Sequence, residues 1–119
     1  MNTTEIAQRL VALCREGKWE TAQKELFAPD AVSIEAAASP AFEKETRGLA
    51  AIEEKGRKWN AMIEQVHSLA VSDALVAENS FACTMNLDVT MTGRPRMQIN
   101  ELCVYGIKDG KIASEQFHM

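Results

Sequence analysis

The chain has 119 residues, of which 46% are hydrophobic and 25% charged, and its formal net charge is −4. This length and composition predict one globular domain over residues 1–119 and leave too few residues for a second. The acidic balance argues against nucleic-acid binding, which depends on a basic surface. No apolar run reaches the roughly 20 residues that cross a bilayer, and the N-terminal residues lack the order of a signal peptide. We therefore expect a cytoplasmic protein that binds neither nucleic acid nor membrane.

Two helices are predicted at the start of the chain. Asn2 and Glu5 have the spacing of a capping box, and an apolar stripe at helical period runs from Ile6 until Gly17 ends it. The same period returns over Trp19–Leu26 and predicts a second, short helix. The two helices are so close in sequence that they must turn back on each other.

A strand and a third helix follow. The segment Phe27–Glu35 suits a short strand, and Ala36–Arg47 has no period and is predicted as a loop that could form a lid or pocket rim. A third helix is then indicated by apolar or small residues at helical spacing, namely Ile52, Gly56, Trp59 and Ile63. The charged residues among positions 53–58 are predicted to form a solvated face of this helix.

The second half of the chain predicts a sheet, because the period falls to two from Val66 onward. Leu75–Met91 alternates as a half-buried strand, Met97–Ile107 is the returning strand, and Asp109-Gly110 signals a hairpin into a last strand at Lys111–Met119. Helices followed by hairpin-linked strands predict an α+β fold, with three N-terminal helices packed on one face of a curved, mostly antiparallel sheet.

Glu101 is the most informative residue of the sequence, because it interrupts an apolar strand face. Its neighbours on that face include Ile99, Cys103 and Tyr105. A carboxylate there must be hydrogen-bonded, line a wet cavity or have a raised pKa, and a raised pKa suits general acid–base catalysis. The alternative is that a bulge shifts the register and leaves Glu101 exposed or in a structural pair.

Other residues are weaker candidates for a site. His67 shares an apolar strand face and could orient or polarise a ligand, and Asn79 could donate a hydrogen bond to one. Trp59 and Tyr105 could form the large walls of a cavity between helices and sheet. The alternatives are a satisfied core histidine, a β-bulge at Asn79, and two core aromatic side chains.

Metal and cofactor chemistry find no support in the sequence. Cys14, Cys83 and Cys103 lie in apolar patterns without a CxxC spacing, so we expect three reduced core thiols. No glycine-rich phosphate loop occurs, and no histidine has a partner at metal-binding spacing. We therefore expect neither a metal nor a cofactor.

Three stretches, in this order, resemble a known family: FAPDAVSIE after a short helix, RGLAAIEEKGRKW as a helix, and VYGIKDGKIASEQF at the end. The chain resembles the NTF2-like superfamily, in its SnoaL-like and ketosteroid-isomerase-like branch. The resemblance implies a cone-shaped α+β barrel of the cystatin/NTF2-like type around an apolar pocket. Glu35 falls at the position of the isomerase base, and Glu101 would share the pocket with it. Leu10 and Cys103 stand where the isomerases carry their oxyanion-binding groups, which argues against the steroid reaction.

These observations give two functional hypotheses. In the first, the protein binds a small hydrophobic carbonyl compound. Glu35 or Glu101 moves a proton next to the carbonyl, and His67 orients or polarises the ligand. The ligand contacts are Trp59, Asn79, Cys103 and Tyr105. Such isomerisation, cyclisation or dehydration needs no cofactor. In the second, the domain is a non-catalytic binding or dimerisation module. Leu102 and Val104, on the outer face of the sheet, favour a homodimer in either case.

Overall fold

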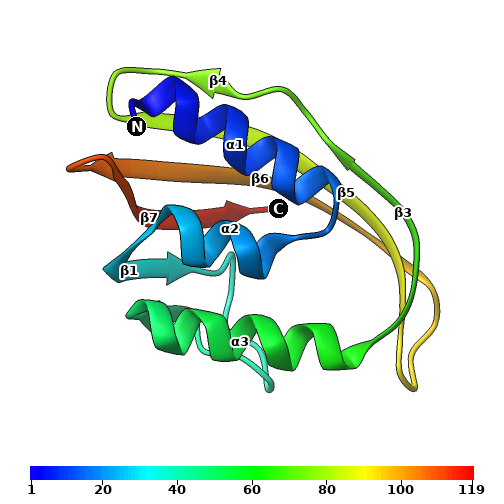
Figure 1. The fold of residues 1–119 in the computed structure, drawn as a ribbon. Coiled ribbons are helices and arrows are strands. Elements are labelled where there is room, and N and C mark those ends of the chain that lie inside the picture. The colour runs from blue at the N-terminus through cyan, green and yellow to red at the C-terminus, as the bar shows by residue number, and fades with distance from the viewer.

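The computed structural model describes residues 1–119, and it confirms an α+β fold with three helices on one side of a curved sheet (Figure 1). The helices are α1 (Thr3–Arg15), α2 (Trp19–Leu26) and α3 (Leu49–Met62). The strands are β1 (Phe27–Ile34), β2 (Glu45–Arg47), β3 (Ile63–Val71), β4 (Leu75–Val76), β5 (Ser80–Met91), β6 (Met97–Lys108) and β7 (Lys111–His118). No helix is long and apolar enough to span a membrane.

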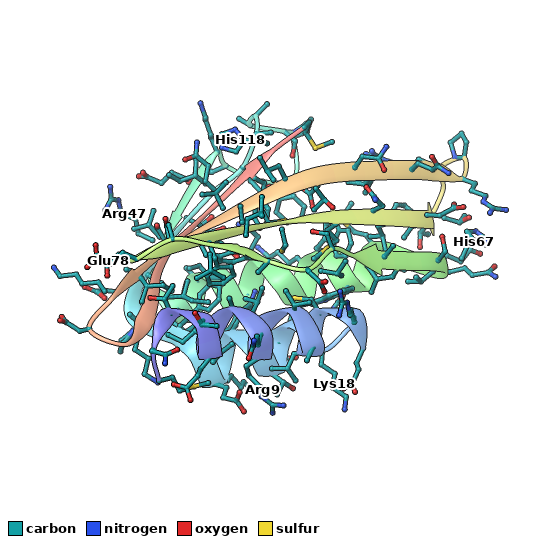
Figure 2. All side chains as sticks on the ribbon, turned by 90° about the horizontal axis from the view of Figure 1, so that it is seen from above. Arg9, Lys18, Arg47, His67, Glu78 and His118 are labelled. Carbon is teal, nitrogen blue, oxygen red and sulfur yellow. The ribbon has the colours of Figure 1, made fainter.

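The sheet has the strand order β2-β1-β7-β6-β5-β3, and β4 pairs with the other part of β5. The β1–β7 pair is parallel, and every other pair is antiparallel. Figure 2, seen from above, shows the sheet curving over a layer that holds all three helices. The helices therefore cover the concave face, and any site between the layers lies on that face.

The helices form where the sequence predicts them. The Asn2 side chain accepts from the Glu5 N–H, and the Glu5 carboxylate accepts from the Asn2 N–H, so the predicted capping box closes at the start of α1. Gly17 ends the turn after α1 with a φ of 71°, a conformation that glycine adopts without strain.

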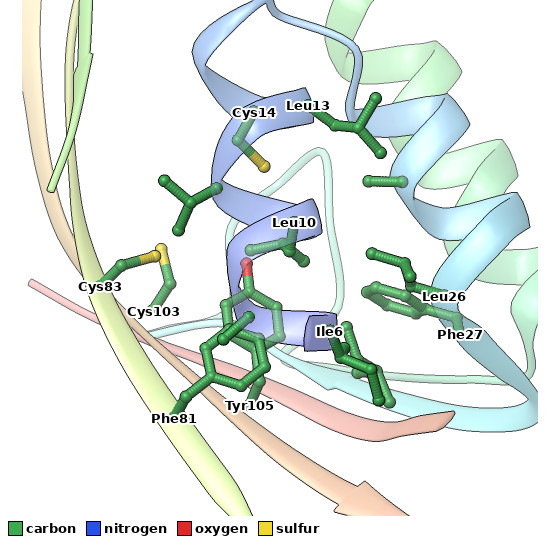
Figure 3. Close-up of a cluster of buried hydrophobic side chains, with 14 of the residues drawn as sticks. Ile6, Leu10, Leu13, Cys14, Leu26, Phe27, Phe81, Cys83, Cys103 and Tyr105 are labelled. Atoms are coloured by element: carbon green, nitrogen blue, oxygen red, sulfur yellow. The ribbon is translucent and has the colours of Figure 1, made fainter. Parts of the chain in front are cut away.

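The core joins the two layers (Figure 3). Ile6, Leu10 and Leu26 from the first two helices are buried against the sheet. On the sheet side, the rings of Phe81 and Tyr105 stack with centroids 4.8 Å apart. All three cysteines are buried free thiols, as the sequence predicts.

Three boundaries differ from the sequence prediction. The predicted loop 36–47 ends in β2, whose residues Glu45–Arg47 pair with β1. The predicted strand Leu75–Met91 is broken, because the chain turns between β4 and β5, where the Ala77 N–H donates to the Ser80 carbonyl. Ile63 is the first residue of β3 and not part of α3, because the helix runs directly into the strand.

Candidate functional site

Five polar side chains gather between α3 and the concave face of the sheet, and we call them the carboxylate cluster. They come from β1, α3, β6, β7 and the residue after β1: Ser33, Glu35, Lys55, Glu101 and Glu115. Hydrogen bonds join four of them, and Glu101 is coupled to the others by charge.

A chain of hydrogen bonds runs through the cluster. The Lys55 ammonium donates to Glu35 Oε1 at 2.8 Å and to Ser33 Oγ at 2.7 Å. The Ser33 hydroxyl donates in turn to Glu115 Oε1 at 2.7 Å. Ser33 and Glu115 are buried, the Lys55 side chain is 14% exposed and the Glu35 side chain is 26% exposed. This chain of hydrogen bonds therefore leads from the buried carboxyl group of Glu115 to that of Glu35, which reaches solvent.

Strand register places the sheet residues of the cluster. Ser33 and Glu115 are direct partners across the parallel β1–β7 pair, and Glu115 is opposite Tyr105 on β6. Glu101 lies four residues before Tyr105 on the same strand, and therefore on the same concave face, since side chains alternate along a strand. The inward position of Glu101, predicted from alternation, follows from this register.

The helix brings the only cation of the cluster. Lys55 lies almost one turn after Ile52, which is fully buried, so both residues face the sheet. Its ammonium nitrogen is also 6.0 Å from the centre of the Phe117 ring. The charged segment 53–58 was predicted to be a solvated face, but Lys55 belongs to the buried side of the helix.

Burial, with a contribution from neighbouring carboxylates, raises the pKa of two carboxyl groups of the cluster. Burial and the charge of Glu35 raise the pKa of Glu101 to about 7, against a smaller lowering by Lys55. Burial raises the pKa of Glu115 to about 7 as well, although the Ser33 hydrogen bond and Lys55 favour its charged form. Both groups can therefore take up or release a proton near neutral pH.

An apolar cavity of about 240 Å³ lies beside the cluster. Its walls come from the 39–42 loop, α3 and the β5–β6 hairpin: Ser39, Pro40, Ala41, Phe42, Trp59, Met62, Met91, Arg94, Met97 and Ile99. Ile99 precedes Glu101 by two residues on one strand face, and Trp59 follows Lys55 by one helical turn. Ile99 is thus the wall residue nearest in sequence to Glu101, and we call this end of the cavity its inner end, although no residue of the carboxylate cluster lines the cavity.

The remaining predicted ligand contacts have different positions. Trp59 lines the cavity and also meets Trp19 edge to face, with ring centroids 6.1 Å apart. Tyr105 and Cys103 are buried in the core, Tyr105 against Phe81 and Cys103 opposite Cys83 (Figure 3). Both side chains are part of the core, and neither lines the cavity.

His67 and Asn79 lie away from the cluster. A register irregularity between Val66 and Ser68 turns His67 to the outer face, where its Nε2 is 2.7 Å from the Thr90 hydroxyl. Asn79 is exposed in the turn before β5. Figure 2 labels His67 near one end of the sheet and Glu78, the neighbour of Asn79, near the other.

Sequence reasoning missed Ser33, Lys55 and Glu115. Lys55 carried a usable signal, since it follows Ile52 by three residues and so shares its helix face. For Ser33 and Glu115 the alternation of apolar and polar residues was misleading, because irregular pairing shifts the inward positions of β1 and β7. No group of three or more His, Cys, Asp and Glu side chains is arranged to hold a metal ion.

The fold and this site define a class: a cone-shaped α+β domain in which a curved sheet and three helices enclose a carboxylate-bearing interior. The family model described as "SnoaL-like domain" matches residues 1–119, and the chain belongs to this family. No curated protein sequence matches the chain significantly.

Solved structures agree with this assignment. A protein from Mesorhizobium loti, described as a proposed SnoaL-like polyketide cyclase and as a carbohydrate phosphatase, is 30% identical, with a TM-score of 0.90 and complete coverage of both chains. A cystatin-like protein of unknown function from Xanthomonas campestris is 19% identical, with a TM-score of 0.81 over 99% of this chain and 90% of that one. A proposed isomerase from Bacillus subtilis is 18% identical, with a TM-score of 0.71 over 99% and 88%. The last two show the fold alone.

Proposed function

We propose that the protein binds a small hydrophobic carbonyl compound and moves a proton next to its carbonyl group, without a cofactor, as an isomerase, cyclase or dehydratase does. The observation that carries this proposal is Glu101, a carboxyl group with a pKa of about 7 that lies two residues along β6 from Ile99, a wall of the apolar cavity. General acid–base catalysis is most effective when the pKa of the catalytic group lies near the working pH. The Mesorhizobium loti protein is described as a proposed SnoaL-like polyketide cyclase and also as a carbohydrate phosphatase, and the first of these descriptions supports the proposal.

The cluster assigns roles to its members. The Glu101 carboxylate takes a proton from the carbon next to the carbonyl, the C–H electron pair moves into the new C=C bond, and the carbonyl oxygen becomes an enolate. The protonated Glu101 then returns the proton to carbon or oxygen. Lys55 supplies the positive charge nearest to this site and stabilises the negative charge that develops. Glu35 and Ser33 hold the Lys55 ammonium in place.

The test is proton exchange on a simple ketone. A thermal-shift screen of planar ketones, enols and phenols first identifies ligands, and acetophenone then serves as the substrate in D2O. We expect the protein to exchange the methyl protons of acetophenone for deuterium, as followed by proton NMR. The Glu101→Gln variant should lose about 100-fold or more of this rate, while its circular dichroism spectrum stays that of the parent protein.

Glu78→Gln is the matched control, because Glu78 is exposed in the turn before β5. This variant should exchange acetophenone at the parental rate. Full activity in Glu101→Gln would contradict the proposal and favour a non-catalytic binding module.

We also propose that two copies of the chain pair through the outer face of the sheet. Leu75 is 81% exposed and Leu102 is 42% exposed on the strands β4 and β6. Leu75 is opposite Ala82, and Ala82 is opposite Val104, so these side chains share the outer face. Exposed apolar groups that gather in this way favour a protein interface.

A further inference from the structure

We infer that the substrate is a single-ring carbonyl compound with a carboxylate at the end opposite its carbonyl, and that Arg94 binds this carboxylate at the mouth of the cavity. The inference rests on the proposed function, because it names the substrate class of the same site. Three observations carry it: the cavity volume, the free guanidinium of Arg94, and the arrangement of charge along the cavity.

The volume limits the ligand to about one ring. The cavity measures about 240 Å³. A cavity of roughly 150 Å³ accommodates benzene, whereas drug-sized ligands occupy pockets of about 300 Å³ or more. A benzene ring with two short substituents therefore fits between Trp59 and Ile99, and a four-ring skeleton does not.

Arg94 is the one arginine of the chain that forms no ion pair. The other five arginines each contact a carboxylate: Arg9 with Glu25, Arg15 with Asp73, Arg47 with Glu45, Arg57 with Glu54, and Arg96 with Asp88. Arg94 lines the cavity from the tip of the β5–β6 hairpin, and no side-chain hydrogen bond engages it. Its guanidinium is therefore available to a ligand, and a guanidinium binds a carboxylate through two parallel hydrogen bonds.

Charge along the cavity fixes the orientation of the ligand. Arg94 is at the tip of the β5–β6 hairpin, whereas Glu101, which is coupled by charge to Glu35 and Glu115, lies further along β6, past Ile99. The Cα atoms of Ile99, which lines the cavity, and Glu101 are about 7 Å apart at the usual rise of a strand, so a ligand in the cavity has its inner end near Glu101. An anionic group at the inner end would meet like charge, so the carboxylate must point to Arg94 and the carbonyl to Glu101.

The probe is 4-acetylbenzoate, a single ring with a carboxylate opposite an acetyl group whose methyl protons can exchange. Its methyl ester is the matched neutral probe. Calorimetry gives the Kd of each, and proton NMR in D2O gives the exchange rate. We expect Arg94→Gln to raise the Kd of 4-acetylbenzoate about 10-fold or more, and to leave the Kd of the ester unchanged. The exchange rate at saturating 4-acetylbenzoate should depend on Glu101.

Arg96→Gln is the control on the same hairpin, because Arg96 pairs with Asp88 and does not line the cavity. It should leave both Kd values unchanged. The inference is overturned if Arg94→Gln binds 4-acetylbenzoate as tightly as the parent protein does, or if the ester binds as tightly as the acid. Exchange of 4-acetylbenzoate that depends on Glu101, with a Kd that Arg94→Gln does not change, would overturn this inference alone and would leave the proposed function standing. Binding of 4-acetylbenzoate that depends on Arg94, without exchange that depends on Glu101, would overturn the proposed catalysis alone.

Discussion

Lys55 determines the charge balance of the site. It is the only cation within reach of three carboxyl groups: it pairs with Glu35, and its charge lowers the pKa of Glu101 and of Glu115. Replacing Lys55 and replacing Glu35 should therefore shift the pKa of Glu101 in opposite directions.

Two substitutions test this balance through the pH profile of proton exchange. Lys55→Met removes a charge that lowers the pKa of Glu101, so the rising limb of the profile should move to higher pH. Glu35→Gln removes a charge that raises the same pKa, so the limb should move to lower pH. Rates of acetophenone exchange between pH 5 and pH 9 measure both shifts. A shift of both variants in the same direction would show that structural damage, and not charge, causes the change.

Glu115 makes stability depend on pH. Its ordinary pKa is 4.5 and its pKa in the folded protein is about 7, so the folded state binds the proton more tightly than the unfolded state. The resulting stabilisation is complete below about pH 4.5 and is lost as the pH rises through about 7. Glu101 contributes in the same direction.

Glu115→Gln should therefore flatten the decline of stability between pH 5 and pH 8. Glutamine has no proton to lose there, and its amide oxygen can still accept from the Ser33 hydroxyl. We expect the variant to melt at a higher temperature than the parent protein at pH 8. Melting temperatures at several pH values measure this, with Glu78→Gln as the control. Parallel curves for parent and Glu115→Gln would rule out Glu115 as the cause.

At the scale of the elements, regular segments could be predicted and irregular pairing could not. The alternation in β6 correctly directs Glu101 inward, since β5 and β6 pair without interruption from Val89 to Ser80. Where β7 pairs with β6, the register shifts between Gly106 and Ile107 of β6. As a result, Ile112 and Glu115 of β7 are both buried although they are three residues apart. Strict alternation from Ile112 directs Glu115 outward, and a single extra residue reverses this.

The first strand shows the same limit. Apolar Val32 and Ile34 suggested the inward face, whereas Ala31 and Ser33 are fully buried and the two larger residues are only partly buried. The pairing of β1 with β7 is irregular after Phe27. The inward position of Glu35 was thus implied by the family resemblance and not by periodicity, while the spacing of Lys55 from Ile52 indicated its helix face but not its pairing with Glu35.

The start of α3 depends on a glycine. Gly48 has a φ of 92°, and its N–H donates to the Ala31 carbonyl at 2.8 Å, which ties α3 to β1. Gly48→Ala forces a side chain into a backbone conformation (φ 92°, ψ 140°) that is almost exclusive to glycine, at a cost of about 1–3 kcal/mol. Gly56→Ala is the matched control, because Gly56 is inside α3 and a Cβ there would lie 3.6 Å from Gln23 Oε1, an ordinary contact.

Urea unfolding should separate these two alanine substitutions. Gly48→Ala should lower the midpoint, and Gly56→Ala should leave it unchanged or raise it, since alanine favours a helix by about 1 kcal/mol over glycine. Equal midpoints for the two variants would mean that the segment before α3 adjusts without strain.

At the scale of the whole molecule, the sheet has one covered face and one open face. The helices occupy the concave face, and the outer face carries Leu75 and Leu102. Sedimentation equilibrium should give the mass of a dimer for the parent protein, and Leu75→Lys with Leu102→Lys should give a monomer, because burying the two ammonium groups would oppose pairing. A monomeric parent protein at micromolar concentration would contradict the proposed homodimer.

The central position of β7 has a consequence for how the protein folds. Strand β7 lies in the middle of the sheet, between β1 and β6, and β1 pairs with no other long strand. The long pairing of β1 therefore joins segments about 80 residues apart in the sequence, and contacts this distant form slowly. The Ser33–Glu115 hydrogen bond spans the same separation, so the buried acid of the site depends on a long-range pairing.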